Sequence, residues 1–305
     1  MTPLVNELQD AAKAASHRVR HALGQAGGVI PVVRLEGPIA APAMSGGLGR
    51  GALNLAGVEP VLRRAFETDD AAAVALVLNS PGGSPAQSEL IGARIRQLAA
   101  KHDLPVFAFC EDVAASGGYW IACAADEIFV TGTSIVGSIG VISASFGAKE
   151  LIGKVGLERR VFTEGDAKHR LDMFEDVRDG DVEWLHGVQA QIHGAFRDWV
   201  TERRGDRLGD DPALFTGEIW IGSKAVELGL ADGVGTLRGV LEERYPDADI
   251  EAMHSPKPLV ARLLGAGTSF DGGGLAGAAA AVTSGALDGA LAGLQRRGLW
   301  ANFGA

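Results

Sequence analysis

Apolar positions and turn residues alternate along the first part of the chain in a repeated order. Val29–Leu35 is rich in β-branched residues and ends at the turn Glu36–Pro38, which predicts a first strand. From Val58 to Phe66 the apolar residues recur at helical spacing, which predicts an amphipathic helix. The apolar run 71–78 that follows lacks the alternation of a half-exposed strand. Such a run is typical of a strand buried on both faces of a parallel sheet.

The same order continues after a glycine-rich turn. Ser84 predicts a helix N-cap, with proline at the first helical position and Gln87 completing a capping box. The buried face of this helix is expected to hold Leu90, Ile91, Ile95 and Leu98. Pro105–Cys110 predicts another buried strand, and 114–125 predicts a turn into a buried helix. The pattern therefore predicts an α/β fold with a largely parallel sheet and right-handed crossovers.

The second half of the chain contains one long helical pattern. Leu157–Phe162 predicts a further strand, and 163–180 is polar with no clear period. A long helix follows, capped by Asp179 or Asp181 and ending near Gly205. Its buried face is expected to hold Val182, Leu185, Val188, Ile192, Phe196 and Trp199. Two short helices are predicted after it, at 223–228 and 237–244.

Composition divides the chain into three parts. An N-terminal segment, 1–27, precedes a single large domain at 28–264. The remaining 265–305 is dominated by glycine and alanine, and it offers too little apolar surface to offset the entropy of ordering. We expect a flexible Gly/Ala-rich tail there. The alternative is that its apolar end docks on another subunit or in a groove.

Charge and cysteine content exclude several classes of function. The chain has 28 basic and 38 acidic side chains and a formal net charge of −10, which argues against a nucleic-acid partner. Cys110 and Cys123 lie in apolar surroundings and form no C-x-x-C pair. We expect buried free thiols, with no metal and no cofactor.

The sequence predicts no integral membrane segment. The first 26 residues carry charges at short intervals, which leaves no apolar core for a signal peptide. The uncharged stretch 128–148 has about the length that spans a bilayer, but its glycines and hydroxyl side chains favour buried strands and turns. A cytoplasmic protein is therefore expected.

Two glycine-rich turns follow two of the predicted strands. One is Asn79–Gly83 and the other is Ala114–Tyr119. Ligands of α/β sheets bind beyond the carboxyl ends of strands, so both turns are expected at one site. Ser116 at a tight turn into a helix is a candidate nucleophile, with the amides of Gly117 and of Gly82 or Gly83 as oxyanion donors. Such a serine also fits a plain turn.

Four blocks of sequence carry a family resemblance. In order they are LNSPGGS, VAASGGYWIA, GTSIVGSIGV and GEIWIGSKAVELGLADGVG. Their order and spacing resemble those of the signal peptide peptidase A (protease IV) family of serine peptidases, over roughly 29–244. The resemblance implies a fold like that of the Clp protease and the crotonases, built of repeated β-β-α units that enclose a buried site.

The resemblance also assigns roles to residues. It implies that Ser116 is the nucleophile and Lys168 the general base, with Ser138 orienting the lysine. It places the oxyanion donors on Gly83 and Gly117. Lysine takes a proton from serine only as the neutral amine, which burial away from water favours.

The assignment of the base depends on the resemblance. From the residues alone, Lys168 cannot be told from Lys149, Lys154 or Lys224. Ala167 stands where the family usually has an aromatic residue, and His169 is an alternative base that would form a serine–histidine pair.

One SPGG block without an internal repeat resembles the short form of the family, which works as a ring of identical subunits. In such a ring the serine and the lysine can come from adjacent subunits. The substrates implied are peptides or unfolded polypeptides, and no membrane anchor is evident. Two other functions stay open: a crotonase-like acyl-CoA hydratase or isomerase, which shares the fold, and a ring that binds peptides without cutting them.

Overall fold

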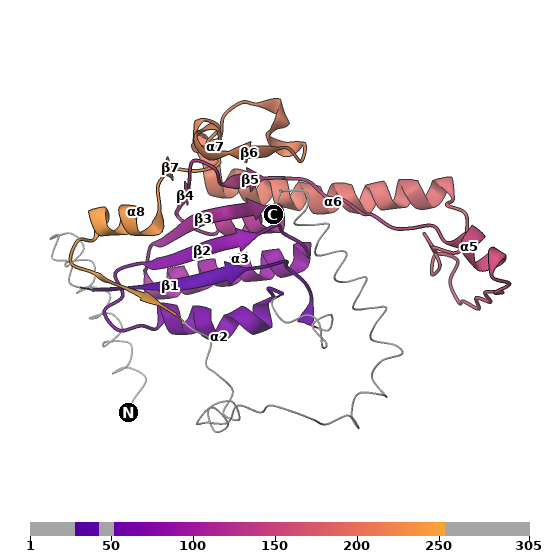
Figure 1. Cartoon of the computed structure of the whole chain (residues 1–305), viewed down its shortest axis with the longest axis horizontal. Helices are drawn as coiled ribbons and strands as arrows, with labels where there is room; N and C mark the ends of the chain where they lie inside the picture. The colour runs from indigo at the N-terminus through magenta and orange to yellow at the C-terminus, as the bar shows by residue number, and fades with distance from the viewer. Residues whose placement is uncertain (1–27, 43–51, 254–305) are drawn as a thin grey trace, which may run out of the picture.

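The computed structural model describes residues 28–42 and 52–253. The segment 1–27, the predicted domain end at 264 and the tail 265–305 lie outside the described residues. At the centre is an eight-stranded sheet with the order β6-β5-β3-β2-β1-β8, in which β4 pairs with β3 and β7 (Figure 1). The strands are β1 (Val29–Glu36), β2 (Val74–Ser80), β3 (Val106–Ala115), β4 (Glu127–Val130), β5 (Ile135–Gly137), β6 (Ile219–Ile221), β7 (Gly233–Val234) and β8 (Asp249–Ala252).

The pairing of the strands confirms the α/β class. All neighbouring strands run parallel, except that β6 runs antiparallel to β5. The helices are α2 (Leu55–Phe66), α3 (Pro85–His102), α4 (Gly117–Ala122), α5 (Lys149–Lys154), α6 (Asp179–Arg204), α7 (Gly222–Glu227) and α8 (Leu237–Arg244). Two 3₁₀ turns, η2 (Gly205–Arg207) and η3 (Pro212–Phe215), follow α6.

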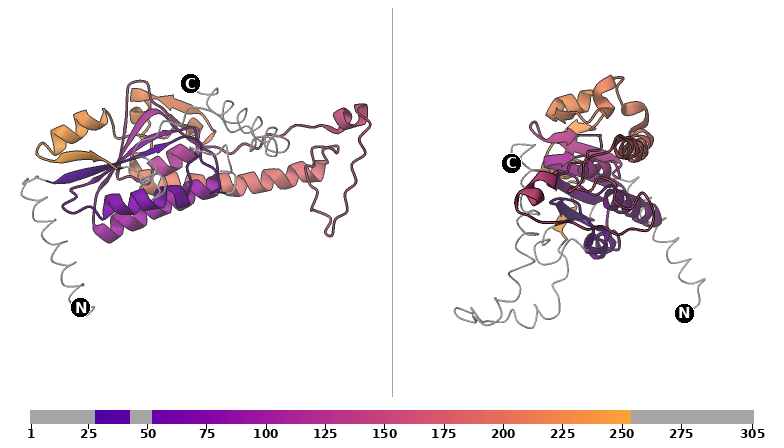
Figure 2. Two further views of the ribbon diagram at one scale, coloured as in Figure 1. Left: turned by 60° about the horizontal axis from the view of Figure 1, so that its bottom comes forward. Right: turned by 90° about the vertical axis from the view of Figure 1, so that its right-hand side faces the viewer.

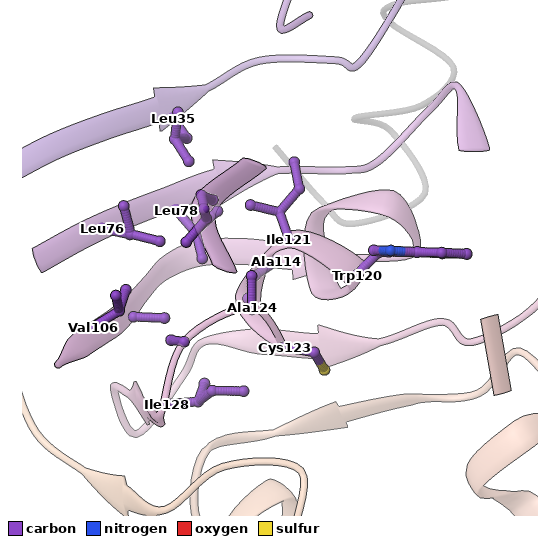
Figure 3. Close-up of a cluster of buried hydrophobic side chains, with 14 of the residues drawn as sticks. Leu35, Leu76, Leu78, Val106, Ala114, Trp120, Ile121, Cys123, Ala124 and Ile128 are labelled. Carbon is purple, nitrogen blue, oxygen red and sulfur yellow. The ribbon is translucent and has the colours of Figure 1, made fainter. Parts of the chain in front are cut away.

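Two apolar clusters cover the two faces of the sheet. The larger joins alternate residues of β1–β3 to α2, α3, α4 and the end of α6. The smaller lies on the opposite face, where Leu241 of α8 belongs to one buried cluster with Ile30, Val77 and Phe109. Figure 3 shows Ile121 of α4 beside Leu78 of β2. Because both faces are covered, the central strands lack a polar alternation, as the sequence predicted.

Helix α3 begins at its predicted N-cap, but two details of its prediction differ from the structure. Ser84 caps α3 by accepting a hydrogen bond from the N–H of Gln87 at 3.4 Å. The capping box itself is wrong, because the Gln87 side chain accepts from the N–H of Leu55 at 2.9 Å and so ties α3 to the start of α2. Leu90, predicted to be buried, is 46% exposed.

An extended arm, residues 141–190, leaves the body of the molecule. Figures 1 and 2 show α5 and the first half of α6 reaching away from the sheet. Ion pairs within the arm hold it together, among them Lys149–Asp176 and Arg178–Asp181. Its most exposed large apolar side chains range from 62% to 91% exposure: Ile142, Phe146, Leu151, Val155, Leu157, Phe162 and Val177.

The arm overturns several predictions from the sequence. The strand predicted at Leu157–Phe162 is wrong: the segment is irregular and exposed, because no strand lies beside it. The N-cap of α6 is Arg178 rather than Asp179 or Asp181. Val182, predicted to be buried, is 37% exposed, and α6 buries its apolar side only near Phe196 and Val200. The uncharged stretch is likewise exposed from 142 to 147.

The cysteine prediction is confirmed. Cys110 and Cys123 are buried free thiols. Burial raises the pKa of Cys123 to about 12, and it raises the pKa of Cys110 further. Across 28–42 and 52–253, no helix has both the length and the apolar character needed to cross a bilayer.

Candidate active site

Ser116 occupies a strained turn between β3 and α4. Its φ of 50° and ψ of −123° lie in a region that residues with a side chain rarely adopt. Such strain costs of order 1–3 kcal/mol and is retained mainly at functional sites. The N–H of Ser116 donates to the carbonyl of Gly137 on β5 at 2.8 Å, which fixes the turn to the sheet. The side chain of Ser116 stays partly exposed.

The Gly82–Gly83 turn approaches Ser116 more closely than any other residue type would allow. A Cβ on Gly82 would lie 2.8 Å from the Cβ of Ser116, and φ is +97° there. A Cβ on Gly83 would lie 2.1 Å from the carbonyl oxygen of Ile39. Because these two residues lack a side chain, their backbone can pass close to the turn that carries Ser116.

Backbone N–H groups from two segments converge beside Ser116. The position of a Cβ on Gly117 lies 3.4 Å from the backbone nitrogen of Gly83. In the part of the chain that is described, neither the N–H of Gly83 nor that of Gly117 has an acceptor. The N–H of Gly82 instead donates to Ser80 Oγ at 3.2 Å. Two free donors beside a serine form the arrangement that holds an oxyanion.

Ser138 directly follows β5, as Ser116 directly follows β3. The parallel register pairs Ala115 with Gly137, the last residues of these two strands, so Ser116 and Ser138 are the next residue of each chain segment. Ser138 also has a left-handed φ, of 51°, and its N–H donates to the carbonyl of Glu218 at 2.7 Å. The structure thus brings Ser116, Ser138, Gly83 and Gly117 together.

Lys168 is not part of this group within one chain. It lies in the segment between α5 and α6, which Figures 1 and 2 place at the outer end of the arm. Its side chain is exposed, and its N–H donates to the carbonyl of Gly165 at 3.1 Å. No described contact joins Lys168 to Ser116.

The other candidate bases are engaged elsewhere. Lys149, Lys154 and Lys224 each pair with a carboxylate, whereas Lys168 has no such partner among the described residues. His169 contacts Arg178 and Glu175 within the arm. Nor does any group of three or more His, Cys, Asp or Glu side chains in 28–42 and 52–253 gather as metal ligands would.

The helix behind the serine is anchored by a buried polar group. Tyr119 of α4 donates its hydroxyl to the carbonyl of Leu230 at 2.8 Å. Burial raises the pKa of Tyr119 well above its ordinary value, so the hydroxyl remains a donor. This bond fixes the turn of α4 that directly follows Ser116.

Ser80 is a further part of the site, which the sequence pattern did not predict. Ser80 is fully buried at the end of β2, where its Oγ holds the Gly82 N–H and so shapes the turn that carries Gly83. A small polar residue between an apolar strand and two glycines was the available signal.

Comparison with known proteins assigns the chain to a family. Residues 99–251, about half of the chain, match the model of peptidase family S49. The chain belongs to peptidase family S49. The matched part of this S49 peptidase contains Ser116, Ser138 and Lys168, and it begins after Gly83.

Individual relatives of the S49 peptidase carry different names. A protease of Synechocystis sp. is 31% identical, over 62% of this chain and 70% of that protein. The chloroplastic serine protease SPPA of Arabidopsis thaliana is 30% identical, over 71% of this chain and 30% of that protein. A Brucella abortus protein named Na(+)/H(+) antiporter NhaA is 47% identical over 90% of this chain. The chain spans only 37% of the length of that Brucella protein.

Proposed function

We propose that this S49 peptidase is a serine endopeptidase that cleaves peptides or unfolded polypeptides through an acyl-enzyme on Ser116. The observation that carries the proposal is the strained turn of Ser116 beside the free N–H groups of Gly83 and Gly117. A nucleophile needs an exposed hydroxyl, and the tetrahedral intermediate needs fixed donors. The turn supplies both.

In the proposed mechanism, Oγ of Ser116 attacks the carbonyl carbon of the peptide bond. Its proton passes to the neutral amine of Lys168, and the oxyanion accepts hydrogen bonds from the N–H groups of Gly83 and Gly117. The lysine then gives the proton to the leaving amine. Water, deprotonated by the same lysine, then attacks the acyl carbon; the bond to Oγ breaks, and the lysine returns the proton to Oγ of Ser116. Ser138, which directly follows the neighbouring strand β5, orients the lysine.

The remote position of Lys168 is part of the proposal. We propose that Lys168 of one copy serves Ser116 of a neighbouring copy in a homo-oligomeric ring. Two observations support this: the arm carries Lys168 away from its own sheet, and it presents apolar side chains such as Ile142 and Phe162 that nothing in the described chain covers. A neighbouring copy would bury the amine, which favours its neutral form.

The proposal extends to the boundaries and the setting of the domain. A Clp/crotonase-like peptidase domain at 28–264 would be flanked by an N-terminal segment and by the Gly/Ala-rich tail. In the longer Brucella relative, the part shared with this chain would be a peptidase module within a protein named for another activity, because the S49 match falls in that shared part. The cytoplasm is the proposed compartment.

Peptide cleavage by matched variants tests the dyad. A mixed pool of unfolded peptides is incubated at neutral pH with the wild type, Ser116→Ala, Lys168→Ala and Lys154→Ala, and products are identified by mass spectrometry. The wild type and Lys154→Ala are expected to cut, because Lys154 is an exposed lysine of the same arm that pairs with Glu150 and has no role in the proposed mechanism. Cutting by Lys168→Ala would refute the base. A folded wild type that cuts nothing would favour the peptide-binding ring or, if it binds acyl-CoA, the crotonase-like enzyme.

Mixing the two inactive variants tests whether subunits share the dyad. When Ser116→Ala and Lys168→Ala are dissociated and reassembled together at equal amounts, a shared site regains both residues at about a quarter of random head-to-tail contacts. Activity of about that share of the wild type is expected. If each subunit holds its own dyad, the mixture stays inactive.

A further inference from the structure

Helix α6 touches both backbone segments that border the candidate site. On one side, Phe196 and Trp199 stack on Trp120 of α4, with ring centroids 4.9 Å and 6.5 Å apart, and Trp199 Nε1 donates to the Trp120 carbonyl at 2.9 Å. On the other side, His193 Nε2 lies 3.2 Å from the carbonyl oxygen of Ile139. The same helix continues outward into the arm.

The segment that His193 contacts is held in an unfavourable conformation. Gly137 and Ser138 have successive positive φ angles of 96° and 51°. The left-handed region is costly for a residue with a Cβ, so surrounding contacts must hold Ser138 there. Two backbone hydrogen bonds help to keep Ser138 in this conformation. The N–H of Ser138 donates to the carbonyl of Glu218 at 2.7 Å, and the N–H of Gly140 donates to the carbonyl of Ser138 at 2.9 Å.

His193 contributes a further hydrogen bond to this turn, from a helix outside the sheet. A carbonyl oxygen only accepts, so the hydrogen of this bond is on Nε2 of the imidazole. Ile139 is fully buried, and no other described group donates a hydrogen bond to its carbonyl oxygen. Removing the imidazole therefore leaves this oxygen without a donor. Loss of the donor leaves a polar group unsatisfied beside Ser138, which favours a shift of the turn.

We propose that His193 is a positioning residue for the serine peptidase: by donating to Ile139, it fixes the backbone turn that aims Ser138 at the catalytic lysine. This inference rests on the proposed Ser116–Lys168 mechanism, and it adds a residue outside the sequence blocks that define the site. His193 touches neither the substrate nor the reacting atoms. Its effect is therefore expected on the rate of the chemical step rather than on substrate binding.

Three variants of the full-length chain test this role. His193→Ala removes the donor, and His193→Gln restores an N–H near the position of Nε2. Asp198→Ala is the control, because Asp198 lies five residues later on the same helix, outside the arm, and is exposed. Cleavage of a substrate peptide found with the wild type gives kcat and KM, and thermal unfolding of each variant reports its folding.

We expect His193→Ala to lower kcat about five- to tenfold with KM changed less than about twofold, as the loss of one hydrogen bond predicts. His193→Gln is expected to recover most of kcat, and Asp198→Ala to match the wild type. Unchanged kcat in His193→Ala, or no recovery in a folded His193→Gln, would overturn the inference while leaving the dyad intact. If the wild type itself does not cut, the proposed function fails and this inference fails with it.

Discussion

Replacing Asp232 by asparagine is expected to remove about 3–5 kcal/mol from the free energy of unfolding, because it leaves a buried cation unpaired. Arg204 is the last residue of α6, and its side chain is 1% exposed. Its two terminal nitrogens donate to Asp232 at 2.8 Å and 3.0 Å, and its Nε donates to the Gly229 carbonyl at 2.8 Å. Asparagine keeps the shape but loses the counter-charge.

The magnitude follows from burial and from the number of bonds lost. Asp232 is 15% exposed and also accepts from the Ile128 N–H at 2.7 Å. An exposed pair of the same kind is worth at most about 1 kcal/mol, so Glu242→Gln, which breaks the surface pair with Arg238, serves as the matched control. In a domain of this size, 3–5 kcal/mol corresponds to a melting temperature lower by roughly 6–20 °C.

Urea denaturation followed by circular dichroism measures the effect. The double variant Arg204→Met with Asp232→Asn is expected to lose less than the sum of the single variants, since removing both charges removes the unpaired ion. A loss below about 1 kcal/mol for Asp232→Asn, equal to that of Glu242→Gln, would refute the reasoning that this pair anchors α6.

The same pair predicts a dependence on pH. Burial by itself raises the pKa of Asp232, but hydrogen bonds from Arg204 and the Ile128 N–H outweigh it, so that the pKa lies below its ordinary value. The carboxylate therefore stabilises the fold above the pKa of an unfolded aspartate, about 4, and this contribution is lost as the pH falls through the lower folded-state pKa. The difference between the wild type and Asp232→Asn should shrink below pH 4.

Three further outcomes are expected. Gly83→Ala should lower kcat roughly 100-fold, because its Cβ has no space and the proposed oxyanion donor must move, and circular dichroism should show a folded protein. Cys110 and Cys123 should resist a thiol reagent in the native protein and react in urea, since burial raises both pKa values; reaction of the native protein at the rate of free thiol would contradict this. Trp120→Ala should cost about 3–5 kcal/mol in urea denaturation through the lost stacking on α6, while Trp184→Ala, at a site 44% exposed, should cost far less; equal losses would show that the stack does not hold the helix.

Local pattern was sufficient for the elements that pack within the chain. β1, α3 and α8 follow their predicted positions, because a buried face leaves its period in the sequence. Leu157–Phe162 has strand-like composition, but β propensity produces a strand only beside a partner, and none lies there. For the same reason the apolar residues of the arm could not be distinguished from core residues.

Only part of the candidate site could be located from the sequence, for a similar reason. The turn of Ser116 and the glycines beside it could be located because strand, turn and helix signals are contiguous in sequence. Ser80 and His193 act through single hydrogen bonds to backbone atoms, and such bonds leave no period or motif. In the proposed ring, the relation of Lys168 to Ser116 would depend on contacts between copies, which the local pattern of a single sequence does not encode.

The pairing of β3 with three other strands has a consequence for local unfolding and for amide hydrogen exchange. β2 pairs along one side of β3, while β4 pairs with its first half and β5 with its last residues on the other. Amide hydrogens shielded on both sides exchange with solvent only when the whole sheet unfolds. The arm, with few buried side chains, opens far more often. Ser116 therefore directly follows a strand that is expected to exchange slowly, and the arm can change conformation while Ser116 keeps its place.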